Sequence, residues 1–374
     1  MDIAIVGGGP AGAYLGYCLA KEGIKATIFD DSHPREKPCG GGISELALRK
    51  FPFIKKIDGV KGIGRKIRII SPVGTEAVIG KGFIMGISRL LLDKYILEMA
   101  KNEGAQLIEE RVLDIKEKNN SWIIKTNKGN KYAKLIVGAD GTNSIVRKNI
   151  LGPHSKENLT MTYGYIVKGI ENELTLMKFL WGKNGYIWVF PRGNHTSIGI
   201  GTELTKSFGI KKHLDFFIKN YYPRVKKLHH FAAMIPTITN PEFFRLPTAG
   251  KNWLVIGDAA GHVDPISAEG ITYALWSAKL AAKAIIYCEP EKFDELWRKE
   301  YGNEFIEAIK LKNILYNPYV LEISIRFAKK SKTYSQFLYD IITSRQEYSK
   351  LKKRLFYDYK KIIIEITKGY LYGN

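Results

Sequence analysis

The sequence has few cysteines and no long hydrophobic run. Its three cysteines, Cys18, Cys39 and Cys288, are too few and too scattered for a disulfide framework, and no Cys-x-x-Cys or Cys/His cluster suggests a metal site. No stretch of roughly 18 uncharged apolar residues occurs, so a transmembrane helix is not expected. The opening residues, MDIAIVGGG, also lack the features of a signal peptide. We therefore expect a cytoplasmic protein without a bound metal, whose only membrane contact is peripheral.

Acidic residues are also scarce relative to basic ones. Lys and Arg number 58 against 37 Asp and Glu, which gives a net charge of +21. Such a charge attracts polyanions, including anionic lipid surfaces, acidic proteins and phosphorylated substrates, although a Lys-rich solvated surface explains it equally well. Nucleic acid is not expected, because no recognition module accompanies the charge. From residue 310 onward there are 14 Lys and Arg but only 5 Asp and Glu, which fits either a membrane-surface segment or ordinary solvated helices.

The first 21 residues predict a strand, a tight turn and a helix. An apolar run over 2–6 ends in a Gly-Gly-Gly-Pro sequence, and helical periodicity follows over 11–21. The glycines match the G-x-G-x-x-G fingerprint, in which they allow the turn, the approach of a pyrophosphate and close helix packing. The helix N-terminus offers N–H groups to the phosphates. The residues expected at a dinucleotide pyrophosphate are Gly7, Gly9, Pro10, Ala11 and Gly12.

A second predicted strand, 26–29, ends at an acidic residue. Asp30 follows Gly12 by 18 residues, which is near the interval expected for an acid that binds ribose hydroxyls. A solvated acid at a strand end is the alternative. The strand, turn, helix and second strand therefore predict a nucleotide-binding unit, but they do not distinguish FAD from NAD.

Later segments predict a discontinuous α/β fold. We expect a hairpin between about 65 and 84, strands at 106–112, 121–126 and 132–138, and a β-rich region from 160 to 202. A Rossmann-like strand follows at Trp253–Ile256, and the chain is mostly helical from about 268. The predicted nucleotide-binding domain comprises 1–65, 85–155 and 245–290; a β-sheet substrate domain comprises 66–84 and 156–244; and a helical C-terminal region comprises 291–374.

Two more motifs follow predicted apolar strands. Residues 135–147 read LIVGADGTNSIVR, and residues 254–275 begin LVIGDAAGHVDP, so that Asp140 and Asp258 lie at the carboxyl ends of their strands, where ligands bind in open α/β sheets. Together with the glycine turn, these motifs resemble the FAD-dependent aromatic hydroxylase and geranylgeranyl reductase superfamily. The resemblance implies FAD as cofactor and a fold similar to that of p-hydroxybenzoate hydroxylase.

The resemblance also implies roles at the cofactor. Gly257 and Asp258 correspond to residues that bind ribityl or ribose oxygens, and the segment from Pro265 to Ile271 corresponds to one beside the isoalloxazine. Gly270 and Ile271 open a predicted helix, whose N–H groups suit the negative charge of a reduced flavin.

Residues 87–100, ISRLLLDKYILEMA, resemble the superfamily's helix whose arginine reaches the FAD phosphate or ribose region. That arginine is Arg89 here. Because Arg89 and Asp93 are spaced i, i+4, a surface ion pair is the alternative.

Two short sequences resemble the geranylgeranyl reductases in particular. Residues 37–43, KPCGGGI, resemble their cysteine-glycine loop and imply site roles for Cys39 and Gly40, although a buried, inert cysteine is the alternative. Residues 186–191, YIWVFP, are similar to their Y-x-W-x-F-P motif. In a strand, Tyr186, Trp188 and Phe190 share one face, so they form either an aromatic wall for a prenyl chain or ordinary core.

The resemblance implies an FAD-dependent reductase that saturates C=C bonds of geranylgeranyl chains, in an archaeal-type membrane lipid or in geranylgeranyl diphosphate. An isolated alkene needs a proton as well as a hydride, and the candidate donors are Cys39, Tyr186 and a water. For His262 we expect a solvent-facing turn position rather than a proton-transfer role. NADPH or reduced ferredoxin would supply electrons. The alternatives are an FAD-dependent aromatic or polyketide monooxygenase and a flavin-containing electron carrier.

Overall fold

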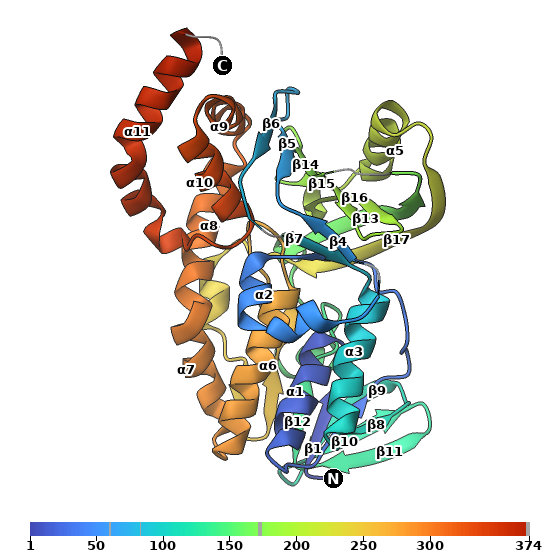
Figure 1. Ribbon diagram of the computed structural model, residues 1–374. Helices are drawn as coiled ribbons and strands as arrows, with labels where there is room; N and C mark the ends of the chain where they lie inside the picture. Colours follow the sequence, from blue (N-terminus) through green and yellow to red (C-terminus); the bar gives the residue numbers. More distant parts are fainter. Residues whose placement is uncertain (60, 83, 171–173, 372–374) are drawn as a thin grey trace. The chain divides into compact units, whose positions relative to one another are not determined.

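A computed structural model describes residues 1–59, 61–82, 84–170 and 174–371 (Figure 1). The chain divides into two compact units, each assembled from three segments. The first unit comprises Met1–Lys37, Arg89–Leu159 and Ile235–Ile306, and the second comprises Pro38–Ser88, Thr160–Met234 and Glu307–Asn374.

The first unit is built on a six-stranded sheet with the strand order β18-β19-β12-β1-β2-β8. The five strands from β19 to β8 run parallel, and β18 is antiparallel to β19. Every residue of β1, β2 and β12 is buried, as expected for short apolar strands covered on both faces. The strands are β1 (Ile3–Val6), β2 (Ala26–Phe29), β8 (Gln106–Ile108), β12 (Leu135–Gly138), β18 (Ala249–Gly250) and β19 (Trp253–Val255).

Helices cover one face of this sheet and a small sheet covers the other. Figure 1 shows α1 (Pro10–Lys21) lying between α3 (Arg89–Asn102) and α6 (Ile271–Ile286). The small antiparallel sheet has the order β11-β10-β9, and its Trp122 and Ile124 share a buried cluster with Ala4 and Ile136. Its strands are β9 (Val112–Lys118), β10 (Ser121–Thr126) and β11 (Gly129–Ala133), and the first unit also contains α4 (Ile145–Ile150) and α7 (Phe293–Trp297). Helix α8 (Asn303–Leu315) begins in the first unit and continues into the second.

The predicted strands at 106–112 and 132–138 are wrong in detail. Each is divided between two sheets: 106–108 forms β8 and 112–118 forms β9, while β11 ends at Ala133 and β12 begins at Leu135. The apolar pattern is nearly continuous across both junctions, so periodicity does not reveal that the hydrogen-bonding partner changes.

The second unit contains a seven-stranded sheet with the order β17-β13-β16-β15-β14-β5-β6 and a three-stranded sheet with the order β3-β7-β4. In the larger sheet β13–β16, β16–β15, β15–β14 and β5–β6 are antiparallel pairs, whereas β14 and β5 run parallel; both pairs of the smaller sheet are antiparallel. The strands of the larger sheet are β5 (Ile67–Ile70), β6 (Glu76–Ile79), β13 (Leu159–Lys168), β14 (Thr175–Phe179), β15 (Tyr186–Pro191), β16 (Thr196–Glu203) and β17 (Lys226–Pro236). Those of the smaller sheet are β3 (Gly42–Ile43), β4 (Lys61–Gly64) and β7 (Ile84–Ile87).

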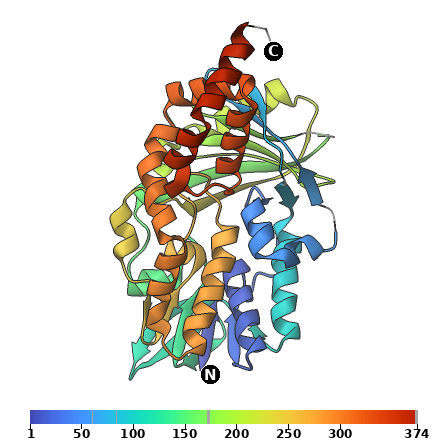
Figure 2. The ribbon, with the colours of Figure 1, turned by 60° about the vertical axis from the view of Figure 1, so that its left-hand side comes forward.

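Both faces of the seven-stranded sheet are covered by helices. Ile187 and Val189 share a buried cluster with residues of α5 (Ile210–Tyr221), whereas Ile69 and Met177 share one with α9 (Pro318–Lys330) and α10 (Lys332–Ile342). The last helix, α11 (Leu351–Leu371), lies beside α9 and α10, as the red helices in Figure 2 show. The remaining helix, α2 (Glu45–Lys50), follows β3.

The C-terminal helices are tied to the sheet by a partly buried carboxylate. Glu322 of α9 accepts hydrogen bonds from the hydroxyls of Ser71 and Thr75, both at 2.5 Å, in the turn between β5 and β6. The second unit therefore joins segments that the sequence assigns to three different domains. The predicted domain boundaries stay a prediction, and residues 60, 83, 171–173 and 372–374 within them lie outside the described part of the chain.

In the described ranges, none of the helices combines the length and the apolar character needed to cross a membrane.

We expect Glu322→Ala to lower the free energy of unfolding by about 1 to 3 kcal/mol, because the hydroxyl of fully buried Ser71 loses its acceptor. Urea unfolding would measure the change. Glu98→Ala, which removes an exposed carboxylate on α3, is the control and should change the value by no more than about 0.5 kcal/mol. Equal unfolding midpoints for the two variants would contradict this account of how α9 is held.

Candidate functional site

The turn after β1 brings glycines against the neighbouring backbone. Gly7 has a φ of +100°, and a Cβ there would lie 2.5 Å from the carbonyl oxygen of Ala139. A Cβ on Gly12 would lie 1.9 Å from the carbonyl oxygen of Gly7. On Gly9, by contrast, it would meet no atom of the described chain within 4 Å. Packing thus requires two of the glycines, and the third leaves open space where a pyrophosphate fits.

Helix α1 begins at that open space. Gly9 is its N-cap and Pro10 its first residue, a position where the missing proline N–H costs no hydrogen bond. The first-turn N–H groups, including those of Ala11 and Gly12, have no partner within the helix and carry the positive end of its dipole. The turn therefore fits a diphosphate, while the contacts themselves stay a prediction.

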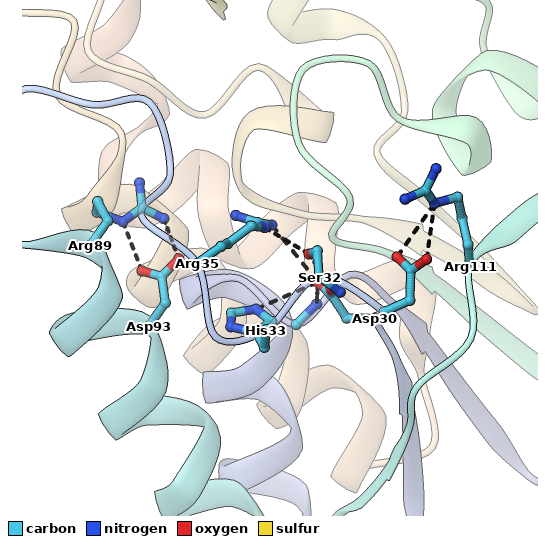
Figure 3. A network of polar contacts seen from close by, with 9 residues as sticks. Asp30, Ser32, His33, Arg35, Arg89, Asp93 and Arg111 are labelled. Carbon is cyan, nitrogen blue, oxygen red and sulfur yellow. Dashed lines mark hydrogen bonds and ion pairs between the residues drawn. The ribbon is translucent and has the colours of Figure 1, made fainter. Parts of the chain in front are cut away.

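Asp30 holds the glycine turn against the end of β2 (Figure 3). One carboxylate oxygen accepts the N–H of Gly8 at 2.7 Å, and the other accepts the N–H of Ser32 at 2.8 Å and the Ser32 hydroxyl. Burial opposes ionisation, but these hydrogen bonds keep the pKa of Asp30 below its ordinary value. The side chain is only 8% exposed, so the alternative of a solvated acid does not apply. Ribose binding by Asp30 stays a prediction.

Arg89 makes the ion pair that its spacing allowed, but the pair is buried rather than on the surface. Its guanidinium contacts both carboxylate oxygens of Asp93 at 2.7 Å, and Asp93 is fully buried (Figure 3). The carboxylate of Glu36 accepts the N–H groups of Arg89 and Leu90 at the start of α3. Arg89 is therefore fixed in place, and its contact with a cofactor phosphate stays a prediction.

Asp140 follows β12 and lies against the glycine turn. A Cβ on Gly7 would be 2.8 Å from the Cα of Asp140. One carboxylate oxygen accepts the N–H of Ile145 at 2.6 Å, whereas the other is buried and has no hydrogen-bond partner among the described residues. Burial raises the pKa of Asp140. An unpaired buried acceptor beside this turn suits a ligand that carries hydroxyl or N–H donors.

The Gly257–Ala260 turn brings Asp258 to two helix N-termini. Gly257 has a φ of +60°, and a Cβ there would lie 3.1 Å from the Cβ of Ala11 in α1. The carboxylate of Asp258 would be 3.1 Å from a Cβ on Gly270, the N-cap of α6. Motifs separated by more than 200 residues of sequence are thus neighbours within the first unit.

The segment between Asp258 and α6 is well ordered by internal hydrogen bonds. Asp264 is fully buried and its carboxylate accepts the N–H groups of Ile266 and Ser267 at 2.9 and 2.7 Å. Pro265 is buried within this turn, and Ile271 is the buried first residue of α6. The predicted opening of a helix at Gly270 and Ile271 is present.

The aromatic residues of β15 share one face, within the second unit. Trp188 is buried and lies between Tyr186 and Phe190, with ring centroids 6.3 Å apart in each pair. The indole N–H of Trp188 donates to the hydroxyl of Ser197 at 3.1 Å. Val189 points into the cluster around α5 instead. The alternation expected for a strand therefore separates an aromatic face from an aliphatic one.

The cysteine-glycine loop lies on this aromatic face. A Cβ on Gly40 would be 3.0 Å from the ring of Phe190 and 3.4 Å from the indole nitrogen of Trp188. The N–H of Gly41 donates to the sulfur of Cys39 at 3.3 Å. Cys39 is partly exposed, so it is not the deeply buried, inert cysteine of the alternative interpretation.

A fully buried arginine holds the same loop. The guanidinium of Arg192, directly after β15, donates to the carbonyl oxygens of Cys39 and Gly40, at 3.1 Å for Gly40. Gly41 has a φ of +71°, and a Cβ there would be 2.6 Å from Arg192. Sequence reasoning missed Arg192, although its position immediately after the Y-x-W-x-F-P sequence was an available signal.

The candidate residues therefore form two groups. Gly7, Asp30, Arg89, Asp140 and Asp258 belong to the first unit with the rest of the glycine turn, and Cys39, Gly40, Tyr186, Trp188 and Phe190 belong to the second. No group of three His, Cys, Asp or Glu that could hold a metal was found in the described part of the chain.

Comparison with known proteins identifies the family. The model of the geranylgeranyl reductase catalytic domain matches residues 158–236, which include β15. A geranylgeranyl diphosphate reductase from Rhodobacter capsulatus is 31% identical over 308 residues, which cover 76% of this chain and 74% of the relative. This chain belongs to the geranylgeranyl reductase family.

Two further matches agree with this family. Digeranylgeranylglycerophospholipid reductase 1 of Methanococcoides burtonii is 26% identical over 353 residues, or 84% of each chain. A solved structure from Thermoplasma acidophilum, titled geranylgeranyl bacteriochlorophyll reductase-like, superposes with a TM-score of 0.78 at 21% identity and covers 95% of this chain and 98% of that one.

The family and the fold confirm the predicted α/β class and the predicted oxidoreductase. The fold also occurs in flavin-dependent enzymes of known structure. None of these matches tests the roles of the individual site residues, which stay predictions.

Two side chains that support the Asp258 turn were not recognised as its supports from the sequence. His154 contacts the carbonyl oxygen of Asp258 at 3.0 Å, and Arg147 donates to that of Ala259 at 3.3 Å. Both pack on the ring of Phe243. Burial lowers the pKa of His154 to about 4 and that of Arg147 to about 10. No periodicity or spacing links these residues, so the sequence carried no signal for the contact.

The expectation that His262 faces solvent is wrong. The side chain is fully buried, its Nδ1 lies 3.0 Å from the hydroxyl of Tyr301, and its ring packs on Trp297 at a centroid distance of 4.6 Å. Burial, with Arg298 and Arg147 acting in the same direction, lowers the pKa of His262 to about 3. The turn sequence suggested exposure, but the C-terminal part of the first unit covers it.

Because His262 is buried in its neutral form, the protein should be less stable at acidic pH. The unfolded histidine gains a proton near pH 6.5 while the folded one stays neutral down to about 3, so stability falls across this window as pH falls. We expect a loss of about 1.4 kcal/mol for each pH unit below 6.5. Urea unfolding at several pH values would show a weaker pH dependence for His262→Gln. The prediction fails if the two slopes are equal.

Arg192 should control the exposure of Cys39. In Arg192→Met the two carbonyl oxygens lose their donor, so we expect about 1 to 3 kcal/mol of destabilisation and faster alkylation of Cys39 by iodoacetamide. Arg192→Lys should restore part of the stability and part of the protection of Cys39 from alkylation. Mass spectrometry would measure the alkylation, with exposed Cys288 as internal reference and exposed Arg49→Met as control. Unchanged alkylation of Cys39 in Arg192→Met would contradict the assignment.

Proposed function

We propose that this protein uses FAD to saturate carbon–carbon double bonds of geranylgeranyl chains. The substrate is a geranylgeranyl glycerophospholipid of the archaeal type or geranylgeranyl diphosphate. The observation that carries the proposal is the seating of the Cys39–Gly40 loop on Trp188 and Phe190, since both sequences are those that resemble the geranylgeranyl reductases. Membership of the family supports it.

The first unit contains the groups that FAD requires. The open space at Gly9 and the N-terminus of α1 suit the pyrophosphate, and Asp30, Asp140 and Asp258 are acceptors for ribose or ribityl hydroxyls. The N-terminus of α6, at Gly270 and Ile271, suits negative charge on a reduced ring. Bound reduced FAD supplies the hydride for the reaction.

Saturating an isolated double bond takes one hydride and one proton, and both are retained in the product. Because no carbonyl group accepts electron density, positive charge develops on the substrate carbon as the proton arrives. The aromatic face of β15 stabilises such charge by about 1 to 2 kcal/mol for each desolvated ring. The same face is apolar and accommodates a prenyl chain.

We further propose Cys39 as the proton donor, with the Tyr186 hydroxyl or a water as the other candidates. Arg192 donates hydrogen bonds to the carbonyl oxygens of Cys39 and Gly40, so the loop that carries the thiol is fixed relative to β15. NADPH or a reduced ferredoxin supplies the electrons, and the net charge of +21 favours an acidic ferredoxin.

Reduced enzyme incubated without oxygen with a geranylgeranyl lipid or geranylgeranyl diphosphate should add two hydrogen atoms per double bond, as read by mass spectrometry. The released cofactor should have the mass of FAD. Absence of a mass gain on every prenyl substrate would refute the proposal, and substrate-dependent oxygen consumption in air would favour the monooxygenase alternative.

Variants of β15 test the aromatic face. Trp188→Leu should lower kcat by roughly 5- to 30-fold, in proportion to the lost stabilisation of positive charge, and Trp188→Phe should recover most of it. Ile187→Val, on the aliphatic face of the same strand, should cost about 0.5 to 1.5 kcal/mol of stability and leave kcat unchanged. Similar kcat losses for Trp188→Leu and Trp188→Phe would contradict a role for the ring.

A further inference from the structure

Helix α11 is anchored on one side by specific contacts with α9 and α10. Arg354 pairs with Asp340 at 2.8 Å and lies over the ring of Phe337 at 5.3 Å. Glu365 accepts hydrogen bonds from the hydroxyls of Ser331 and Thr333 at 2.6 and 2.9 Å. The orientation of the helix about its own axis is therefore fixed, and so is the face that it turns away from the unit.

The outward face of α11 carries two parallel rows of apolar residues. Residues seven apart lie nearly above one another on a helix, because seven residues make almost two turns. One row is Phe356, Ile363 and Tyr370, and the other is Tyr357, Ile364 and Leu371. All six side chains are between 54% and 73% exposed. Lys353, Lys360 and Thr367 lie between the rows and are exposed, so the six apolar groups and these residues form a patch of mixed apolar and basic character.

The charge on the exposed part of this helix is entirely positive. Lys352, Lys353, Lys360, Lys361 and Lys368 are all exposed. Both acidic residues are partly buried and paired: Glu365 accepts hydrogen bonds from Ser331 and Thr333, and Asp358 lies 3.5 Å from Arg354 of the same helix. The patch therefore combines apolar and aromatic groups with unneutralised lysines, the composition of a helix that lies in a membrane interface.

We propose that the outward face of α11 docks on an anionic lipid surface. The apolar rows enter the boundary between headgroups and acyl chains, while the lysine ammonium groups reach back to lipid phosphates on their flexible stems. A second copy of the chain is a less suitable occupant, because a twofold contact along this helix brings like-charged lysines together. Docking requires no reaction and goes beyond the proposed function, but it places the protein where long prenyl chains reside.

Flotation with lipid vesicles tests the proposal directly. The wild-type protein should bind vesicles of phosphatidylglycerol and phosphatidylcholine in equal parts, bind weakly to pure phosphatidylcholine, and dissociate as salt is raised. The triple variant Phe356→Gln, Ile363→Gln and Ile364→Gln should bind on the order of 100-fold more weakly, at about fivefold for each lost apolar group. The matched control replaces Leu113, Tyr132 and Tyr287, three exposed apolar residues of the first unit, with Gln and should bind as the wild type does.

Two double lysine variants distinguish local attraction at α11 from the effect of the protein's net charge. Lys352→Gln with Lys360→Gln should weaken binding to the anionic vesicles by roughly 25-fold, or about fivefold for each lysine. Lys116→Gln with Lys118→Gln removes the same charge from exposed positions of β9 and should have no comparable effect. Equal losses from the two pairs would mean that the whole protein's charge is responsible, and would overturn the assignment to α11.

Two further outcomes overturn the proposal. One is binding of the triple variant as tight as that of the wild type. The other is that the wild-type protein forms an oligomer in solution, the triple variant is a monomer, and neither binds vesicles. That result would identify a second copy of the chain as the occupant. Reductase activity on detergent-dispersed geranylgeranyl diphosphate should be unchanged in the triple variant. Lack of that activity in the wild type, with vesicle binding intact, would refute the proposed function and leave the docking surface standing.

Discussion

Close approach of backbone to backbone at the carboxyl end of β1 is the constraint on which the first unit depends. A side chain on Gly12 would overlap the carbonyl of Gly7, and one on Gly7 would overlap that of Ala139, so α1, β1 and β12 meet at van der Waals distance only because these residues are glycine. That approach places the N-terminus of α1 beside the ends of its neighbouring strands. Asp30 is attached to it through the N–H of Gly8, Asp140 lies against Gly7, and the Gly257 turn packs on Ala11. The three motifs are therefore neighbours, and close backbone packing at Gly7 and Gly12 is what brings the first two together.

The second unit fixes its candidate residues by a different means. The Cys39–Gly40 loop belongs to no regular element, and its peptide carbonyls are satisfied by the buried guanidinium of Arg192. A buried charge without good partners is costly, so the loop and the arginine hold each other in place. The glycines of the loop then allow it to lie directly on the rings of Phe190 and Trp188. For a reaction that delivers both a proton and a hydride to an apolar chain, a rigid loop beside an aromatic face is a suitable arrangement.

Part of the excess positive charge lies on the exposed side of helix α11. On α11, Glu365 accepts hydrogen bonds from Ser331 and Thr333, and Asp358 pairs with Arg354 of the same helix, which leaves only lysines among the exposed charged residues. The same contacts orient the helix so that its apolar rows face outward. A protein of a family whose members are named for prenyl diphosphates and prenyl phospholipids thus presents basic and apolar residues on its C-terminal helix α11.

The sequence alone determined the cofactor motifs, the strand-turn-helix at the N-terminus, and the separation of Trp188 from Val189 on opposite faces of a strand. These features depend on local spacing, and the period of a strand or a helix is fixed by covalent geometry. Only the tertiary structure showed that the chain passes from one sheet to another after Ala133, and that Arg89 forms its ion pair in the interior. It also showed that aromatic rings enclose His262, and that Arg192 and His154 hold loops that are distant in sequence. Such contacts join residues whose proximity arises only when the sheets are packed, and for this reason no local pattern records them.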